Sequence, residues 1–189
     1  MSRSLLIIAL ILTSACRRLP GVVSVLPDFQ MTAIGPTTER PFGRSDMLGK
    51  VWVVDFIYTR CAGPCPLLTQ SLARLSGSLP SQIGLLSITV DPEGDTPARL
   101  RAYAKAYGAN TRWVFLRGTM TDTYQLLFAG FHLPLSLDPK APPGTRVQHS
   151  TRFALVDSNG AIRRFYDGLS AVDNAALARD ARRLLEVGS

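Results

Sequence analysis

Residues 51–76, VWVVDFIYTRCAGPCPLLTQSLARLS, contain the pattern that decides the fold. Val51 to Ile57 is a nearly continuous apolar run, which is typical of a central strand covered on both faces. From Pro66 to Ser76 the leucines recur at helical spacing. Cys61 therefore lies in the turn between a buried strand and a helix, and Cys65 lies near the start of that helix.

Apolar β-branched runs and helical stretches alternate along the rest of the chain, which indicates a sheet with crossover helices. The elements expected, in chain order, are a strand at 83–90, a helix at 97–107, a strand at 113–116, a helix at 122–130, a proline-rich loop at 133–148, a hairpin of 152–156 and 161–166, and a helix at 172–187. This order predicts an α/β, thioredoxin-like fold, with a central mixed sheet flanked by helices and an N-terminal extension that contains a hairpin.

Short signals mark several of these boundaries. Asp91-Pro92 is interpreted as a strand terminator, and Asp95-Thr96-Pro97 as a helix start in which Thr96 is the cap. Gly108 is expected to end that helix. Residues 157–160, DSNG, form a strong turn signal for the late hairpin.

The N-terminus has the features of a secretory signal. Arg3 supplies a positive charge, residues 5–12 are apolar, and small residues at 13–15 lead into Cys16. The apolar run is far shorter than the roughly 20 residues that a membrane-spanning helix needs. Small residues before a cysteine resemble a bacterial lipoprotein signal. We therefore expect lipid on Cys16, with an ordinary signal cleaved nearby as the alternative.

The chain is thus divided into a signal peptide (1–15), a tether (16–27) and one thioredoxin-like domain (28–189). The expected location is extracytoplasmic, anchored by lipid to the outer face of the bacterial cytoplasmic membrane, where disulfides can form. The net charge of +7 suits a protein held near anionic lipid headgroups. Because the arginines are scattered along the chain, nucleic acid is not an expected partner.

The spacing of Cys61 and Cys65 allows two kinds of chemistry. If Cys16 accepts lipid, these two cysteines remain as a pair. The N-terminus of the adjacent helix would stabilise a thiolate at Cys61. The two sulfurs could bond to each other or converge on one metal ion, so spacing alone does not separate redox chemistry from metal binding. An inert staple is less favoured because so short a loop constrains the unfolded chain little.

A metal site needs a further ligand, and the chain has two histidines. His149 lies at the end of a long loop, where functional groups are often presented. His132 follows a helix end and is interpreted as a capping or packing residue. Two thiolates and one imidazole favour copper, above all Cu(I), whereas structural zinc normally takes four protein ligands. Binding of Cu(II) is left open.

Several ordered motifs resemble those of the Sco/SenC family, copper-handling proteins that take part in maturing cytochrome oxidase. The resemblance covers about residues 28–170. It rests on PDF at 27–29, LGKVWVVDFIYTRC at 48–61, the Cys-x3-Cys-Pro element at 61–66, SITVDPEGDTPARLRAYAKAYGA at 87–109, and HSTRFALVDSNG at 149–160. By resemblance, the copper ligands are Cys61, Cys65 and His149.

The resemblance also implies a function and partners. It implies a metallochaperone, tethered to the outer face of a cytoplasmic membrane, that delivers copper to the CuA site of an oxidase subunit. Other copper carriers and thiol reductants are the further partners expected. One position departs from the family: many members have Asp before the histidine, whereas this chain has Gln148. A negative neighbour that would tune the histidine is therefore missing.

A second resemblance supports an alternative function. Asp55 stands six residues before Cys61, the offset of the buried acid that relays protons in thioredoxins, and CAGPC resembles their CGPC with Ala62 inserted. The alternative is a thiol-disulfide oxidoreductase that keeps the oxidase copper-site cysteines reduced. Cys61 and Cys65 would be its redox pair and Asp55 a candidate proton relay. A solvent-facing Asp55 at a strand edge is left open.

Overall fold

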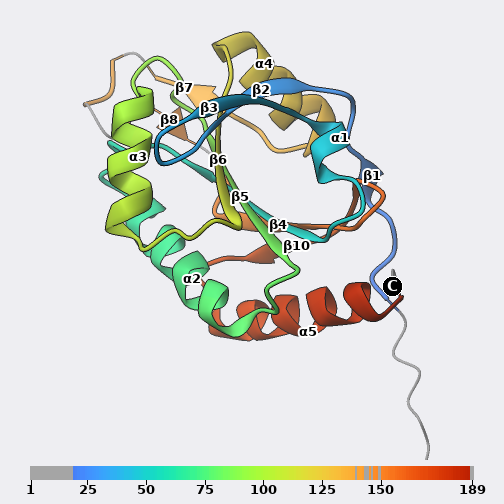
Figure 1. Cartoon of the computed structure of the whole chain (residues 1–189). Coiled ribbons are helices and arrows are strands. Elements are labelled where there is room, and N and C mark those ends of the chain that lie inside the picture. Colours follow the sequence, from blue (N-terminus) through green and yellow to red (C-terminus); the bar gives the residue numbers. More distant parts are fainter. Residues whose placement is uncertain (1–18, 139, 143–144, 146, 149, 188–189) are drawn as a thin grey trace, which may run out of the picture.

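The computed structural model describes residues 19–138, 140–142, 145, 147–148 and 150–187, apart from the side chains of residues 137 and 148. Its main strands are β1 (Ser24–Val25), β2 (Gln30–Ile34), β3 (Glu39–Gly43), β4 (Trp52–Ile57), β5 (Gly84–Thr89), β6 (Trp113–Arg117), β9 (Arg152–Val156) and β10 (Ala161–Asp167). They form one eight-stranded sheet in the order β1-β10-β9-β4-β5-β6-β2-β3 (Figure 1). Neighbours β4, β5 and β6 are parallel, and the other pairs are antiparallel.

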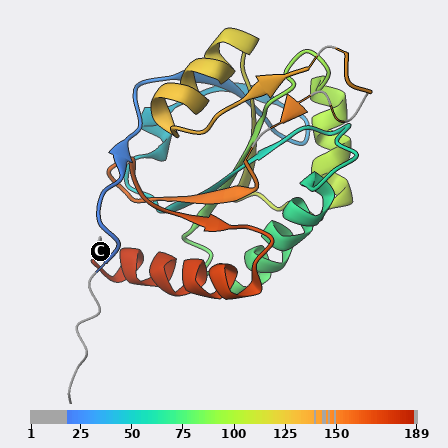
Figure 2. The same ribbon diagram turned by 180° about the vertical axis from the view of Figure 1, so that it is seen from behind.

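Helices cover both faces of this sheet. They are α1 (Arg44–Met47), α2 (Cys65–Ser78), α3 (Pro97–Ala106), α4 (Met120–Gln125), the π-helical turn η1 (Leu126–Gly130) and α5 (Ala171–Val187). The view from behind shows α2, α3 and α5 on one side of the sheet and α4 on the other (Figure 2). Each side has its own buried apolar cluster. The predicted α/β arrangement, a mixed sheet flanked by helices, is confirmed.

Strand β4 is buried along its whole length, as its apolar run predicts. Val53 and Ile57 belong to the cluster under α2, α3 and α5, whereas Val54 and Phe56 belong to the cluster on the opposite face. Alternate side chains of a strand point to opposite faces, so a strand between two cores must be apolar on both. The exception to this apolar pattern is Asp55.

The expected boundary signals of α3 are present. The Thr96 side chain accepts a hydrogen bond from the backbone N–H of Arg99 at 3.3 Å, and Pro97 is the first helical residue. After the helix, Gly108 has a φ of +67°, a left-handed conformation that glycine adopts without strain.

Two predicted segments differ from the structure. The helix expected at 122–130 begins at Met120, because Thr119 and Asp122 form a reciprocal capping box, and it changes to π-helical geometry at Leu126. The loop expected at 133–148 contains a small hairpin of β7 (Ser136–Leu137) and β8 (Val147–Gln148).

The N-terminal part agrees with one expectation and differs from another. The hairpin predicted in the extension is β2–β3, and it joins the main sheet because β2 pairs with β6. The expected tether reached Pro27, but β1 pairs with β10 and Leu26 is buried, so these residues pack on the domain. The signal peptide and Cys16 lie outside the described residues. Within the described part of the chain, no helix is long and apolar enough to cross a membrane.

The turn between β9 and β10 has the geometry that its sequence predicts. Oδ1 of Asp157 accepts hydrogen bonds from the backbone N–H groups of Asn159 at 2.9 Å and Ala161 at 3.0 Å. Gly160 has a φ of +76°. A side chain at that position would strain the turn.

We expect Gly160→Ala to lower the free energy of unfolding by about 1 kcal/mol, because alanine resists a positive φ. Gly77→Ala is the matched control, since Gly77 lies within α2 and a Cβ there would meet nothing within 4 Å. This control should raise the stability by about 0.5 kcal/mol or slightly more. Urea unfolding of the two variants checks both values. Equal effects of the two substitutions would contradict this account of the turn.

Candidate functional site

The two cysteines lie where β4 passes into α2. Strand β4 ends at Ile57, and the chain turns back so that the N–H of Cys61 donates to the carbonyl of Tyr58 at 3.2 Å. Pro64 precedes the first helical residue, Cys65, and its carbonyl accepts from Leu68 at 3.0 Å. The prediction that Cys61 lies in the turn and Cys65 at the helix start is confirmed.

The two cysteines differ in exposure. Both carry thiols in the structure; Cys61 is partly exposed, and Cys65 is 1% exposed. Burial raises the pKa of the Cys65 thiol well above its usual range, and its hydrogen bond with Cys61 raises it further. At this first helical residue the cost of desolvation exceeds the stabilisation that a helix N-terminus gives to an anion. The metal-free Cys65 is therefore a neutral thiol at physiological pH.

Tyr58 is a site residue that the sequence analysis did not identify. Its side chain is only 3% exposed. Burial raises the pKa of its hydroxyl, and a hydrogen bond with Cys61 raises it further. The phenol of Tyr58 therefore stays protonated beside the Cys61 sulfur. Tyr58 directly follows the apolar run of β4, and nothing in that pattern gave a sign of this contact.

The turn before Cys61 is held by a buried carboxylate. Asp95 is fully buried. The N–H of Thr59 donates to both of its oxygens at 3.1 Å, and the Thr59 hydroxyl donates to Oδ1 at 2.6 Å. The Thr89 hydroxyl donates to Oδ2 at 2.5 Å. Desolvation raises the pKa of Asp95 even though these hydrogen bonds act in the opposite direction. The backbone two residues before Cys61 is thus fixed to the end of β5.

A second contact holds the next residue of the turn. Nη2 of Arg60 lies 2.7 Å from Oδ2 of Asp91, and Oδ1 of Asp91 accepts from the N–H of Gly94 at 3.1 Å. Because Arg60 is half exposed, this ion pair alone adds little stability. The interpretation of Asp91 and Asp95 as simple boundary residues is therefore incomplete. Their carboxylates also position the turn between β4 and α2 (residues 58–64), called the cysteine turn below.

Asp55 is fully buried, so the alternative of a solvent-facing side chain is wrong. It lies on a central strand, on the face covered by α2 and α3. The Ser87 hydroxyl donates to its Oδ1 at 2.5 Å, and Nε1 of Trp113 donates to Oγ of Ser87 at 2.8 Å. The negative charge of Asp55 contributes to the raised pKa of Cys65. The buried acid expected from the thioredoxin offset is therefore present and acts electrostatically on the inner thiol.

This geometry can be compared with known proteins. A family model described as SCO1/SenC matches residues 22–186. The chain belongs to the SCO1/SenC family. The family predicted from the sequence is thereby confirmed, and the solved family structure reported below confirms the predicted thioredoxin-like fold.

Individual members of the SCO1/SenC family show the extent of the similarity. The chain is 31% identical over 127 residues to the SCO1 protein homolog of Bacillus subtilis (strain 168), covering 64% of this chain and 64% of that protein. It thus spans somewhat less than two thirds of that curated relative. A SCO1/SenC family lipoprotein from Bacillus anthracis has a TM-score of 0.77 and 30% identity, covering 89% of this chain and 99% of that one. Yeast Sco1 with copper bound has a TM-score of 0.66 and 25% identity, covering 81% and 87%.

His149, the third expected ligand of this SCO1/SenC chain, lies outside the described residues. Within the described ranges, no group of three or more His, Cys, Asp or Glu side chains could hold a metal ion. The structure thus places Cys61 and Cys65 together, and the approach of His149 to them stays a prediction. Val147, two residues earlier, belongs to the same buried cluster as Tyr58 and Cys65.

His132 takes the position expected for the end of a helix. It directly follows the C-cap of η1 and has a φ of +52°, and the next residue, Leu133, donates its N–H to the carbonyl of Leu127 at 3.0 Å. This is a left-handed helix-ending conformation. Its side chain is exposed, so it does not pack in the core.

We expect Asp95→Ala to loosen the turn before Cys61, because the N–H of Thr59 and the hydroxyl of Thr89 lose a buried acceptor. Leaving such groups unsatisfied should cost about 2 kcal/mol or more of unfolding free energy. The amide of Thr59 should exchange with deuterium faster than in the unmodified protein. Glu93→Ala, an exposed change in the same loop, is the control and should alter neither property. Unchanged protection of Thr59 in Asp95→Ala would show that this carboxylate does not hold the turn.

Proposed function

We propose that this protein is a copper metallochaperone that binds Cu(I) through Cys61, Cys65 and His149. The observation that carries the proposal is the hydrogen-bonded pair of thiols at the start of α2, one buried and one partly exposed. Soft thiolate sulfurs select Cu(I) among the common metal ions. The copper-bound structure of yeast Sco1, a relative of this chain, supports copper as the cargo.

The chain's own residues would control how the cargo is taken up. A thiol binds copper as a thiolate, so uptake replaces the protons of Cys61 and Cys65. The neutral, buried Cys65 thiol keeps negative charge out of the apolar cluster until a cation arrives to balance it. The hydroxyl of Tyr58 is placed to donate a hydrogen bond to the Cys61 sulfur. Oxidation of the two thiols to a disulfide would remove both sulfur ligands, so loading and oxidation exclude each other.

The proposed recipient is the CuA-bearing subunit of a respiratory cytochrome oxidase. Because Cys61 is the more exposed sulfur, we expect an incoming ligand of the recipient to displace it first and Cys65 last. Anchoring through lipid on Cys16, at the outer face of the cytoplasmic membrane, would keep the domain near a membrane-bound recipient. The net charge of +7 would favour the same surface.

Titration of the reduced protein with Cu(I), against a competing chelator, tests the ligand set. Cys61→Ser and Cys65→Ser should each abolish tight binding. His149→Ala should weaken Cu(I) binding at least about tenfold. Even loss of a residue that only hydrogen-bonds to a metal ligand lowers metal affinity by about that factor. His132→Ala is the matched control, since it removes the other histidine of the chain, and it should bind as the unmodified protein does.

The outcomes of this titration separate the parts of the proposal. If His149→Ala binds Cu(I) as tightly as the His132→Ala control, the imidazole is not a ligand and only the sulfur pair remains. If both serine variants still bind Cu(I) tightly, the metallochaperone proposal fails.

A second function, thiol-disulfide oxidoreductase, is favoured by the buried Asp55 and its electrostatic effect on Cys65. The Cys61 thiolate would attack a partner disulfide, forming a mixed disulfide while the partner's other sulfur leaves as a thiolate. Cys65 would then lose its proton, with Asp55 as the candidate acceptor, and attack the Cys61 sulfur. This releases the reduced partner and leaves a Cys61–Cys65 disulfide, which a thiol reductant must reduce. In the cell, such a cycle would keep the oxidase copper-site cysteines reduced.

Metal-free exchange with a small disulfide substrate tests this second function. Cys65→Ser should accumulate the mixed disulfide on Cys61, detectable by mass spectrometry, because the resolving thiol is absent. Asp55→Asn should slow resolution and leave formation of the mixed disulfide unchanged. His149→Ala is the control and should exchange at the normal rate. Absence of a mixed disulfide in Cys65→Ser would rule the reaction out.

A further inference from the structure

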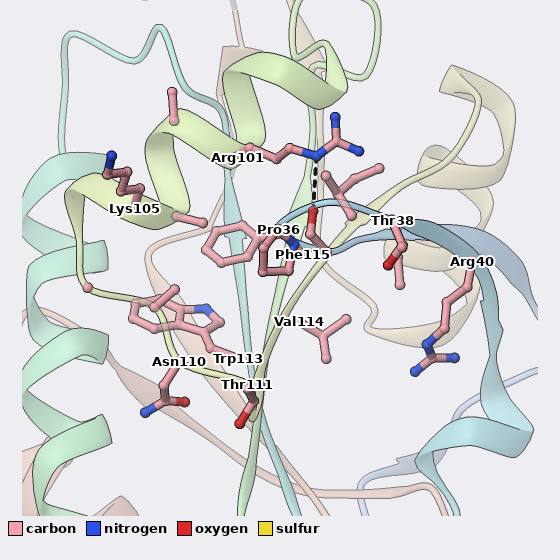
Figure 3. Close-up of a pocket in the computed structure, with 17 residues that line it drawn as sticks. Pro36, Thr38, Arg40, Arg101, Lys105, Asn110, Thr111, Trp113, Val114 and Phe115 are labelled. Atoms are coloured by element: carbon pink, nitrogen blue, oxygen red, sulfur yellow. Dashed lines mark hydrogen bonds between the residues drawn. The ribbon is translucent and has the colours of Figure 1, made fainter.

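A groove of about 730 Å³ lies between α3 and the β2–β3 hairpin (Figure 3). It opens on the face of the sheet that α2, α3 and α5 cover. Its lining comes from β2, the hairpin, α3, the loop after α3 and β6, and includes no residue of the cysteine turn. A volume of this size is within the roughly 300–1,000 Å³ typical of small-molecule sites. The groove is thus a feature separate from the candidate copper site.

The topology of the sheet explains why the groove exists. Beyond β6 the sheet continues with β2 and β3, whereas α3 packs against β2 and β6. The groove runs alongside α3 over this part of the sheet. Its floor includes Ile34 and the stacked rings of Trp113 and Phe115, whose centroids are 5.5 Å apart. The two rings are only 5% and 2% exposed, and the inner surface of the groove is mainly apolar.

The charged side chains that line the groove are all cationic. They are Arg40, Arg101 and Lys105. Arg101 is held in place because it donates to the carbonyl of Gly35 at 3.0 Å and to Glu39 at 2.8 Å. Lys105 is exposed and forms no ion pair within 4.0 Å in the described part of the chain. Figure 3 shows both residues on α3, above the rings of Trp113 and Phe115, with the Arg101 guanidinium directed toward the hairpin and the Lys105 amine on the other side of the helix.

The groove offers no unpaired strand backbone to which an extended peptide could hydrogen-bond. Ala33 and Ile34 of β2 already pair with β3 on one side and with β6 on the other. A peptide that binds by adding a strand needs an unpaired sheet edge. A non-peptide ligand matches this surface better if it has an apolar body that packs on the groove floor and a negatively charged head that lies near the cations of α3.

We propose that the groove binds a single acyl chain with a carboxylate head, a free fatty acid. The acyl chain would lie along the apolar floor of the groove, and the carboxylate would face Lys105, because Arg101 is already paired with Glu39. Burial of methylene groups supplies most of the affinity. Lys105 fixes the orientation of the ligand. This proposal does not depend on the copper function.

Dodecanoate is the probe, and binding is measured by calorimetry on the unmodified protein. Lys105→Gln should weaken binding by several-fold, whereas Arg179→Gln, which removes an exposed charge on α5, should not. Ala104→Phe, on the groove side of α3, should abolish binding by filling the groove. Ala106→Phe is its matched control, because Ala106 is an exposed residue of the same helix outside the groove lining, and it should bind normally.

A second measurement locates the ligand. Trp52 and Trp113 are the two tryptophans of the chain, so Trp52→Phe leaves Trp113 as the sole indole reporter. Saturable quenching of its fluorescence by 11-bromoundecanoate, reversed by dodecanoate, would place the acyl chain at the groove floor. Circular dichroism checks that each variant is folded.

Two further ligands test the chemistry of the head group and the source of the ligand. Dodecanol has a neutral head and should bind at least several-fold more weakly than dodecanoate. Anionic phospholipid vesicles should not displace bound dodecanoate. Equal binding of dodecanol, equal binding by Ala104→Phe and Ala106→Phe, or displacement by vesicles would each overturn the proposal. If Ala104→Phe does not fold, the Lys105→Gln and dodecanol measurements still decide it.

Discussion

The site depends on one buried carboxylate that joins the ends of two parallel strands. Asp95 follows β5, and its oxygens accept hydrogen bonds from Thr59, at the end of β4, and from Thr89, at the end of β5. Since β4 and β5 run parallel, their C-terminal ends meet at the same edge of the sheet. Burying a carboxylate is costly, and here the cost is offset by several donors directed at one group. The hydrogen bonds between Thr59 and Asp95 therefore fix the position of the cysteine turn.

The two sulfurs show how burial and helix geometry compete. Cys65 occupies the first position of a helix, which favours a thiolate, but its burial and the nearby Asp55 favour the thiol. Cys61 is only partly buried and packs against the apolar cluster that contains Cys65. A pair with one accessible and one buried sulfur suits stepwise exchange of a cargo or of a disulfide. The order of the steps then follows from exposure.

Much of the fold could be predicted from the sequence because it follows from local patterns. The apolar run of β4 and the helical leucine spacing of α2 bracket the cysteines, and Thr96 and Gly108 mark the limits of α3. The short β7–β8 hairpin could not be predicted, since two-residue strands leave no periodicity in the sequence.

The site could be predicted only in part. The cysteine pair is visible in its spacing, and the offset of Asp55 from Cys61 indicated a buried acid. The contacts of Tyr58 and Asp95 could not be predicted, because they join residues whose proximity exists only after the strands pair. His149 is a prediction from the ligand count and from family resemblance, and the described residues do not test it.

The two edges of the sheet have a consequence for crowded conditions. At one edge, β1 is two residues long; at the other, β3 presents Glu39, Arg40 and Pro41 as exposed residues. Proline cannot donate to a neighbouring strand, and exposed charges disfavour pairing of one sheet edge with another. Copies of the domain at high local concentration are thereby discouraged from joining edge to edge into fibrils.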